Sequence, residues 1–480
     1  MGHGIRAALA ALGTVAAVAA PARAQGPRDE VVRTVEARHT RDAAVARQIW
    51  SFAEVGFQET RSSALLQQEL AASGFTVEKG VAGMPTAFVA SYGSGKPVIG
   101  LYAEFDALPG LSQDSTPGLR SLGGNAGHAC GHHLLGTASV SAAVAVKEWL
   151  AKNRKSGTVR LFGTPAEEGG SGKVYMVRDG LFDGVDVVLG WHPGAGNNAS
   201  AQSTLANMSG KFRFRGVSAH AAAAPDRGRS ALDGVEAMDH MVNMMREHVP
   251  SDTRIHYVIT DGGRAPNVVP DRAEVYYYVR SPDPVIVKEV WGRVLKAAEG
   301  AALGTGTTVT HEVIAGVYNV LPNETLARLM HGNLQRIGGL RYTPAEQAFA
   351  TEIRRTLDNP RVPLAAAGTV EPFTVSERGG AASTDVGDVS WAVPVAELST
   401  ATWVPGTAAH SWQAVAAGGT SIGAKGATLA AKTMAASAVE LLTNPALVRQ
   451  ARAEFDRRRG PGFKYVPLLG DRKPALDYRK

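Results

Sequence analysis

Short apolar runs alternate with helical patterns along this chain, and that alternation limits the possible fold more than any other feature of the sequence. The strand-like runs occupy residues 88–92, 98–105, 159–163 and 185–190, with helical patterns at 134–152 and 173–179. Apolar strands separated by helices are typical of a parallel sheet that is covered on both faces. We therefore expect an α/β fold built on a mostly parallel, doubly covered sheet.

The middle of the chain has a different pattern. Residues 211–215 alternate charged and aromatic side chains with period two, as a half-exposed antiparallel strand does. After it come a helix at 231–246, strands at 255–259 and 273–280, a helix at 285–302 and a strand at 307–314. The order β-α-β-β-α-β is that of a ferredoxin-like unit. We expect residues 208–320 to form a small α+β domain inserted between the two parts of a larger domain, 25–207 and 321–480.

The α/β pattern resumes after this insertion. It comprises a helix at 323–338, a strand at 395–399 and a long helix at 420–442. Residues 341–380 have little periodicity and are expected to be irregular, and the tail from Gly460 is expected to run over the surface.

The first 24 residues are expected to be a cleaved signal peptide. Arg6 precedes an apolar stretch at 7–20, and Ala22-Arg23-Ala24 has the A-x-A pattern of a cleavage site. The protein is therefore predicted to be exported, most simply to the periplasm; the alternative is an uncleaved N-terminal anchor. We find no later segment that reads as a membrane span.

Composition excludes some other classes of protein. The formal net charge is +6, but the basic residues are interspersed and no basic patch carries aromatic partners, so we expect no nucleic-acid partner. Cys130 is the only cysteine, so an exported chain of this kind has no internal disulfide. The core of a 480-residue chain must supply the stability.

The segment 128–133, with the sequence HACGHH, is the strongest local signal for a chemical site. Cys130 and His132 are two residues apart and would point in nearly opposite directions on a regular helix. They can converge only on an irregular turn that leads into the following helix. A thiolate with an imidazole suits zinc or a similar transition metal. The alternative is a buried cysteine in a histidine-rich turn.

A second signal is the pair Glu167-Glu168, which follows the strand at 159–163. Adjacent residues at the end of a strand point in opposite directions. One carboxylate can then bind a metal while its neighbour faces the substrate as a general base. The alternative is a solvated acidic loop.

Three further residues are ordinary singly but share a place in the predicted sheet. His192 and Asp106 each end an apolar strand, and His410 follows the strand at 395–399 at a distance. The carboxyl ends of parallel strands are where open α/β sheets build their sites. Asp106 can orient a ligating histidine there. Together with Cys130 and the glutamate pair, these groups suffice for two divalent ions that share a water.

Eight motifs in this order resemble the di-metal peptidase family of aminoacylase and carboxypeptidase G. The resemblance is greatest for its amidohydrolase branch, which includes aminobenzoyl-glutamate hydrolase and hippurate hydrolase. The motifs are EFDALPG (104–110), GHACGH (127–132), GTPAEEGGSGK (163–173), WHP (191–193), GVSAHAAAAPDRGRSALDGVEAM (216–238), APNVVPDRAEV (265–275), STDVGDVSW (383–391) and GTAAHS (406–411).

The resemblance implies a role for each of these sites. The implied metal ligands are Cys130, His132, Glu168, His192 and His410. Glu167 is implied as the general base, and His220 as the residue that reaches the scissile carbonyl, across a homodimer formed by the inserted domain. Asn267 and Arg280 are implied to bind the substrate's carboxylate, a role that also suits the planar guanidinium. Exposed-loop and surface ion-pair alternatives stay open for His220 and Arg280.

The implied cofactors are two divalent ions, with zinc, manganese and cobalt all compatible. The implied activity is hydrolysis of the amide bond of N-acyl amino acids such as aminobenzoyl-glutamate. A dipeptidase and a catalytically silent small-molecule binding protein are the alternatives. His133 departs from the branch, which carries Asp or Asn at this position, so His133 is expected to ligate, to tune the site or to turn away.

Overall fold

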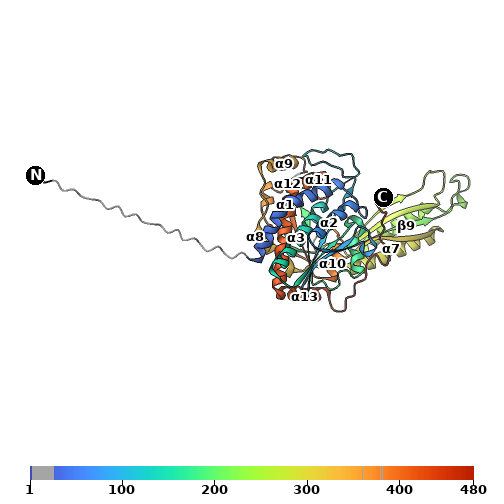
Figure 1. Ribbon diagram of the computed structural model, residues 1–480. Helices are drawn as coiled ribbons and strands as arrows, with labels where there is room; N and C mark the ends of the chain where they lie inside the picture. Colours follow the sequence, from blue (N-terminus) through green and yellow to red (C-terminus); the bar gives the residue numbers. More distant parts are fainter. Residues whose placement is uncertain (3–25, 359, 379, 381, 480) are drawn as a thin grey trace.

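A computed structural model describes all residues of the chain except 3–25, 359, 379, 381 and 480. The expected signal peptide therefore lies almost wholly outside the described residues. The chain forms a large α/β domain, from which a smaller α+β domain projects at one side (Figure 1).

A six-stranded sheet forms the centre of the large domain. Its strand order is β1 (Thr76–Lys79), β2 (Phe88–Ser94), β6 (Gly157–Gly163), β3 (Val98–Ala103), β7 (Val187–Gly194) and β14 (Val395–Ala401). The strands β6, β3, β7 and β14 run parallel, whereas β2 pairs antiparallel with both β6 and the edge strand β1. The expectation of a mostly parallel sheet is confirmed, and β1 is an additional strand.

Helices cover both faces of this sheet. On one face α3 (His132–Asn153) and α12 (Ser421–Thr443) pack on the strands, and α1 (Pro27–Phe52) packs against both helices (Figure 1). The Trp191 indole faces this layer and donates a hydrogen bond to the Leu135 carbonyl. Tyr102 of β3 lies on the opposite face of the sheet from Trp191. Its ring there lies near Lys173 of α5 (Gly172–Arg178).

Helix α3 is rich in alanine and apolar on all sides, which is typical of a helix in a protein core. Among the residues that the structure describes, it is the one helix with the length and hydropathy of a membrane span, and most of it is buried inside the large domain.

The smaller domain has a four-stranded antiparallel sheet in the order β10 (Arg254–Asp261), β11 (Arg272–Ser281), β9 (Ala206–Arg215) and β12 (Thr308–Val317). Helices α6 (Ala231–Met245) and α7 (Pro284–Thr305) cover one face. Phe212 and Phe214 are buried under these helices, whereas Lys211 and Arg213 lie on the opposite face. The predicted period-two alternation and ferredoxin-like order are both observed.

The second part of the large domain contains more regular structure than its sequence periodicity predicts. It comprises α8 (Glu324–Ile337), α9 (Pro344–Arg355), α10 (Val386–Ala392), α11 (Trp412–Gly418) and α13 (Pro445–Arg459), besides β14 and α12. The expectation of an irregular segment at 341–380 is wrong for α9. The Thr343 side chain and Glu346 cap its first turn reciprocally, which stabilises a helix whose apolar periodicity is short.

Candidate metal centre

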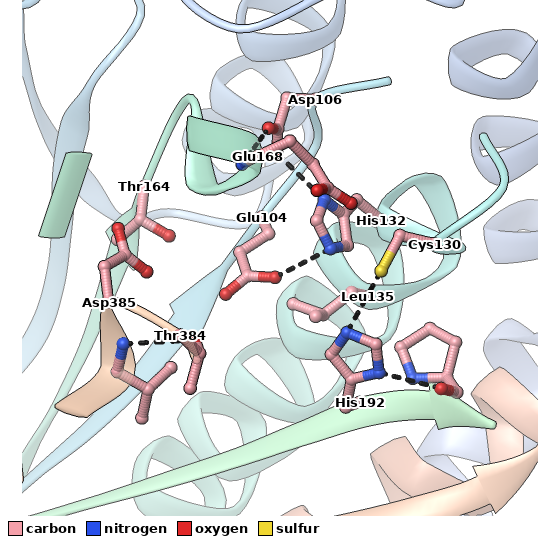
Figure 2. Close-up of polar contacts among 12 residues, drawn as sticks. Glu104, Asp106, Cys130, His132, Leu135, Thr164, Glu168, His192, Thr384 and Asp385 are labelled. Atoms are coloured by element: carbon pink, nitrogen blue, oxygen red, sulfur yellow. Dashed lines mark hydrogen bonds and ion pairs between the residues drawn. The ribbon is translucent and has the colours of Figure 1, made fainter. Parts of the chain in front are cut away.

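Cys130 and His132 lie on a sharp turn at the start of α3. Gly131 has φ +79°, a left-handed conformation that L side chains rarely adopt, and a Cβ at this position would lie 2.7 Å from the Pro193 side chain. The turn brings the Cys130 Sγ within 3.4 Å of the His192 Nε2 at the end of β7 (Figure 2). The irregular turn that the sequence requires is thus present.

Two carboxylates hold the His132 ring between them. Its Nδ1 lies 2.9 Å from Asp106 Oδ1, and its Nε2 lies 3.1 Å from Glu104 Oε2 (Figure 2). The second oxygen of Asp106 accepts a hydrogen bond of 2.9 Å from the Glu168 backbone N–H. Asp106 therefore orients both a histidine and the neighbouring glutamate loop.

The loop that carries Glu167 and Glu168 has an irregular backbone. Ala166 and Ser171 have φ of 57° and 58°, values that cost free energy in residues other than glycine and that cluster at functional sites. The Glu168 carboxylate lies 3.1 Å from the His410 Nε2. The chain end also fixes this loop, because Tyr478 Oη and an Arg479 guanidinium nitrogen donate hydrogen bonds of 3.0 and 2.8 Å to the Glu168 carbonyl.

These side chains form three overlapping groups whose possible ligand atoms lie within 4.8 Å of one another. The groups are Cys130, His132 and His192; Cys130, Glu168 and His410; and Glu104, His132 and Glu167. Cys130 belongs to the first two groups, so its sulfur stands where one ligand can serve two adjacent ions. Thiolate, imidazole and carboxylate together suit zinc and similar transition metals.

The buried polar atoms of the site fit a metal. Glu104 Oε2, His132 Nε2 and Glu168 Oε1 are buried, and among the described residues their 3.1 Å contacts, Glu104 with His132 and Glu168 with His410, lack hydrogen-bond geometry. Such orphaned atoms are rare in native proteins and call for an ion or water. The site therefore supplies both the donor types and the unsatisfied atoms that a divalent ion requires.

Burial and like charge dominate the electrostatics of the glutamate pair. Burial, with Glu104 and Glu168 nearby, raises the pKa of Glu167 well above its ordinary value. Burial also raises the pKa of the Cys130 thiol. Burial disfavours a charged His132, but Cys130, Asp106 and Glu104 outweigh it and raise the pKa of this imidazole. The excess of acidic groups is what bound cations would compensate.

Lys173 is a buried cation to which the sequence motifs assign no role. Its Nζ lies 2.6 Å from Glu104 Oε1 and 2.6 Å from Asp385 Oδ1, and all three side chains are buried. A lysine inside the apolar run that forms α5 is the local signal that points to such a pair. Lys173 thus holds Glu104 against His132.

Several residues singled out from the sequence lie elsewhere. The His133 Nε2 is 3.0 Å from the Gly418 carbonyl and its ring contacts His128, so His133 belongs to none of the three groups. His220, Asn267 and Arg280 lie in the smaller domain. Nδ1 of the exposed His220 accepts hydrogen bonds from the Ala222 and Ala223 N–H groups. The Arg280 guanidinium lies over the Tyr278 ring.

A cavity of about 460 Å³ opens beside the three groups of possible ligands, here termed the metal groups. It contacts Cys130, Glu167, Glu168, His192 and His410 and extends along β14 toward α8. None of His220, Asn267 and Arg280 lines it. A parallel α/β sheet with these ligand groups at its carboxyl edge, and an inserted domain beside them, defines a metal-binding hydrolase of the α/β class.

The comparisons with known proteins agree with this class. The chain belongs to peptidase family M20/M25/M40, whose model matches residues 100–412. Its hydrolases act on amide bonds, and the chain is an enzyme of this kind. The chain is 44% identical to one of the two subunits of p-aminobenzoyl-glutamate hydrolase of Escherichia coli over 450 residues, which is 88% of this chain and 93% of that protein. It is 30% identical to the Xaa-Arg dipeptidase of Mus musculus over 86% of this chain and 88% of that protein.

Solved structures share the fold at lower identity. One is a dinuclear metal-binding peptidase of the M20 family from Bacillus subtilis, with a TM-score of 0.58 at 19% identity over 85% of this chain and 99% of that chain. Another is an aminobenzoyl-glutamate utilization protein from Klebsiella pneumoniae, with a TM-score of 0.59 at 18% identity over 87% and 98%.

Proposed function

We propose that the protein is a di-metal amidohydrolase that cleaves the amide bond of N-acyl amino acids resembling aminobenzoyl-glutamate. The observation that carries this proposal is the position of Cys130 in two adjacent ligand groups, with Glu167 in a third group that overlaps the first at His132. The 44% identity to a subunit of p-aminobenzoyl-glutamate hydrolase over most of both chains supports the choice of substrate.

In this proposal Cys130, His132, His192, Glu168 and His410 hold two divalent ions, zinc or manganese. Bound ions of this kind lower the pKa of water and polarise an amide carbonyl. Glu167 takes the proton of the attacking water and passes it to the leaving amine. Burial and the neighbouring carboxylates raise the pKa of Glu167, and bound cations would oppose this shift, so that the carboxylate could accept the proton. Asp106 and Glu104 keep the His132 ring in place.

The inserted domain is proposed to supply His220, Asn267 and Arg280 from a second copy of the chain. In one copy these residues do not line the cavity beside the metal groups. The outer strand β10 and helix α6 expose a set of large apolar side chains, Met241, Met244, Tyr257, Val258 and Ile259. Exposed apolar side chains at an open strand edge are typical of an interface. This supports a homodimer through the inserted domain. Because the Escherichia coli relative has two different subunits, a complex with a second, different chain is the other outcome.

A dipeptidase is the second candidate, favoured by the 30% identity to an Xaa-Arg dipeptidase over 86% of the chain. Export is a separate part of the proposal and rests on the sequence of residues 1–24. Amino-terminal sequencing of the protein from its native host tests it: mature protein should begin at Gln25, and an intact Met1 in all of it would contradict export with cleavage.

The test of function is hydrolysis by the purified mature protein of 4-aminobenzoyl-glutamate, hippurate and dipeptides that end in arginine. Each substrate is measured before chelation, after chelation and after manganese or zinc is restored. Turnover that is lost with chelator and returns with metal supports the proposal, and the best substrate separates amidohydrolase from dipeptidase. Bound metal without turnover of any substrate would favour a silent binding protein.

A further inference from the structure

The cavity beside the metal groups contains a third glutamate, Glu397, which the roles described above do not use. Glu397 lies on β14 and pairs in register with Gly190 of β7, while Ser399 pairs with His192. Residues two apart on a strand share a face. Glu397 therefore lies on the same face of the sheet as His192, about 6.6 Å farther from the metal edge along the strand.

Tyr102 holds the Glu397 side chain in place. Its hydroxyl donates a hydrogen bond to Glu397 Oε1, and its ring reaches across Gly190, where any side chain would collide with it. Glu397 Oε2 makes no hydrogen bond or ion pair with any residue that the structure describes. Glu397 is only partly buried and borders the cavity. One carboxylate oxygen is thus fixed by the protein, and the other is available to a ligand.

The charge around Glu397 favours a ligand that donates a hydrogen bond. The described residues that line the cavity include Glu167, Glu168 and Glu397 but no lysine or arginine. The nearby cation Lys173 is already paired with Glu104 and Asp385. Burial raises the pKa of Glu397 to about 7, although the Tyr102 hydrogen bond opposes this. An N–H donor would stabilise the carboxylate where the protein provides a single hydroxyl.

The cavity surface is more apolar than polar. Its apolar residues include Ala201, Val320, Val395 and Leu398, and its polar residues include Ser200, Gln202 and Ser399. A mainly apolar cavity with a few polar groups can accommodate a flat acyl group, and a carboxylate inside it can identify the far end of that group. The rise of about 6.6 Å along β14 from Ser399, which pairs with His192, to Glu397 is comparable to the length of a benzene ring with a para substituent. An α-amino group next to the scissile carbonyl would lie at the metal groups instead.

We infer that Glu397 recognises an N–H donor at the far end of the substrate's acyl group, so that the cavity selects amine-bearing aromatic acyl groups over plain ones. The inference rests on the proposed function and specifies its substrate class. It makes Glu397 a specificity-determining residue that contacts the substrate and leaves the scissile bond to the metal groups and Glu167.

The experiment compares two substrates of equal shape, 4-aminobenzoyl-glutamate and 4-methylbenzoyl-glutamate. The manganese-loaded protein should have a kcat/KM roughly ten- to a hundredfold higher for the amino compound, the range expected for a hydrogen bond to a charged group. Glu397→Leu should abolish this preference by lowering turnover of the amino compound while sparing the methyl compound. Glu148→Gln is the matched control, because Glu148 is exposed on α3, far from the cavity lining; it should keep the wild-type ratio.

A second measurement does not depend on turnover. Calorimetry should show that 4-aminobenzoate binds more tightly than 4-methylbenzoate to the wild-type protein and equally to Glu397→Leu. Equal kcat/KM values in the wild type, or an equal loss for both substrates in Glu397→Leu, would overturn the inference while the proposed function stands. If no amide is hydrolysed with any metal, the proposed function fails, and the calorimetric pair still decides: equal binding of the two acids by the wild type overturns the role of Glu397.

Discussion

The Tyr478 hydroxyl donates a hydrogen bond of 3.0 Å to the Glu168 carbonyl, and so joins the end of the chain to the loop that carries both glutamates of the site. The Tyr478 ring also contacts Phe57 edge-on, with ring centroids 5.6 Å apart. Between Gly460 and Arg479 the tail also contacts the smaller domain, where Arg472 binds Glu312 and the Ile314 carbonyl of β12. The tail therefore links both domains to the glutamate loop.

We expect Tyr478→Phe to lower kcat about two- to tenfold with little change in KM, because one neutral hydrogen bond that positions Glu167 and Glu168 is lost. Removal of residues 478–480 should lower kcat further, since Arg479 shares the same carbonyl. Steady-state kinetics on the metal-loaded protein measure this effect. Tyr92→Phe is the control, because its hydroxyl makes no hydrogen bond within the described part of the chain. Equal kcat in Tyr478→Phe and Tyr92→Phe would contradict a positioning role for the tail.

Replacement of Cys130 should affect metal binding more than replacement of a ligand that belongs to one group only. Cys130 is common to two groups, whereas His410 belongs to one. We expect Cys130→Ala to retain neither ion and His410→Ala to retain about one per chain. Metal content after dialysis, measured by mass spectrometry, checks this. His133→Asn should keep both ions, because His133 belongs to none of the groups; equal metal contents in Cys130→Ala and His410→Ala would argue against a shared thiolate.

Lys173→Met should destabilise the fold by roughly 3–5 kcal/mol, because it leaves Glu104 and Asp385 buried without their cation. Burial already raises the pKa of Asp385 to about 6, although Lys173 opposes this. Adding Asp385→Asn removes one of the uncompensated carboxylates, so the double variant should be more stable than Lys173→Met. Denaturant unfolding of the metal-free proteins measures both. An unfolding free energy of Lys173→Met within about 1 kcal/mol of wild type would be inconsistent with this buried network.

Asp239 should make the stability of the smaller domain depend on pH. This buried carboxyl accepts a hydrogen bond from the Tyr277 hydroxyl. Burial raises the pKa of Asp239 to about 6, whereas the pKa of Asp in an unfolded chain is about 3.9. The folded state thus holds the proton more tightly, so the contribution of Asp239 to stability is complete below about pH 4. It falls as the pH rises to about 6, by roughly 1–3 kcal/mol.

Asp239→Asn keeps an acceptor for Tyr277 but cannot ionise. The unfolding free energy of the variant relative to wild type should therefore increase between pH 4 and pH 6 and then stay constant. Denaturant titrations of both proteins at pH 4, 5, 6 and 7 give this difference. A difference that does not change with pH, or that falls as pH rises, would contradict a raised pKa for Asp239.

The places of the main strands along the chain and the meeting of distant candidate ligands can both be predicted from the sequence. Cys130, His132, Glu168, His192 and His410 can be expected together because the carboxyl ends of parallel strands meet at one edge. Helix α9 could also have been predicted, since its capping box is a local signal between Thr343 and Glu346.

Other parts of the site have no local signal in the sequence. Glu397 meets Tyr102 across 295 positions, and Tyr478 meets Glu168 across 310. These contacts arise from sheet register and from the path of the tail, which residue spacing does not encode. The place of His220 and Arg280 outside the cavity of their own chain is likewise a property of the tertiary arrangement.

The central claim is that Glu167 acts as the general base and Glu168 as a metal ligand. It is tested by measuring the metal content of Glu167→Gln and Glu168→Gln and their hydrolysis of 4-aminobenzoyl-glutamate. Glu168 lies in a ligand group with Cys130 and His410, and Glu167 lies beside His132 and Glu104. We predict that Glu167→Gln keeps two ions and loses turnover by several orders of magnitude, while Glu168→Gln loses metal. Wild-type turnover in Glu167→Gln, or loss of its metal to the same extent as in Glu168→Gln, would contradict the account.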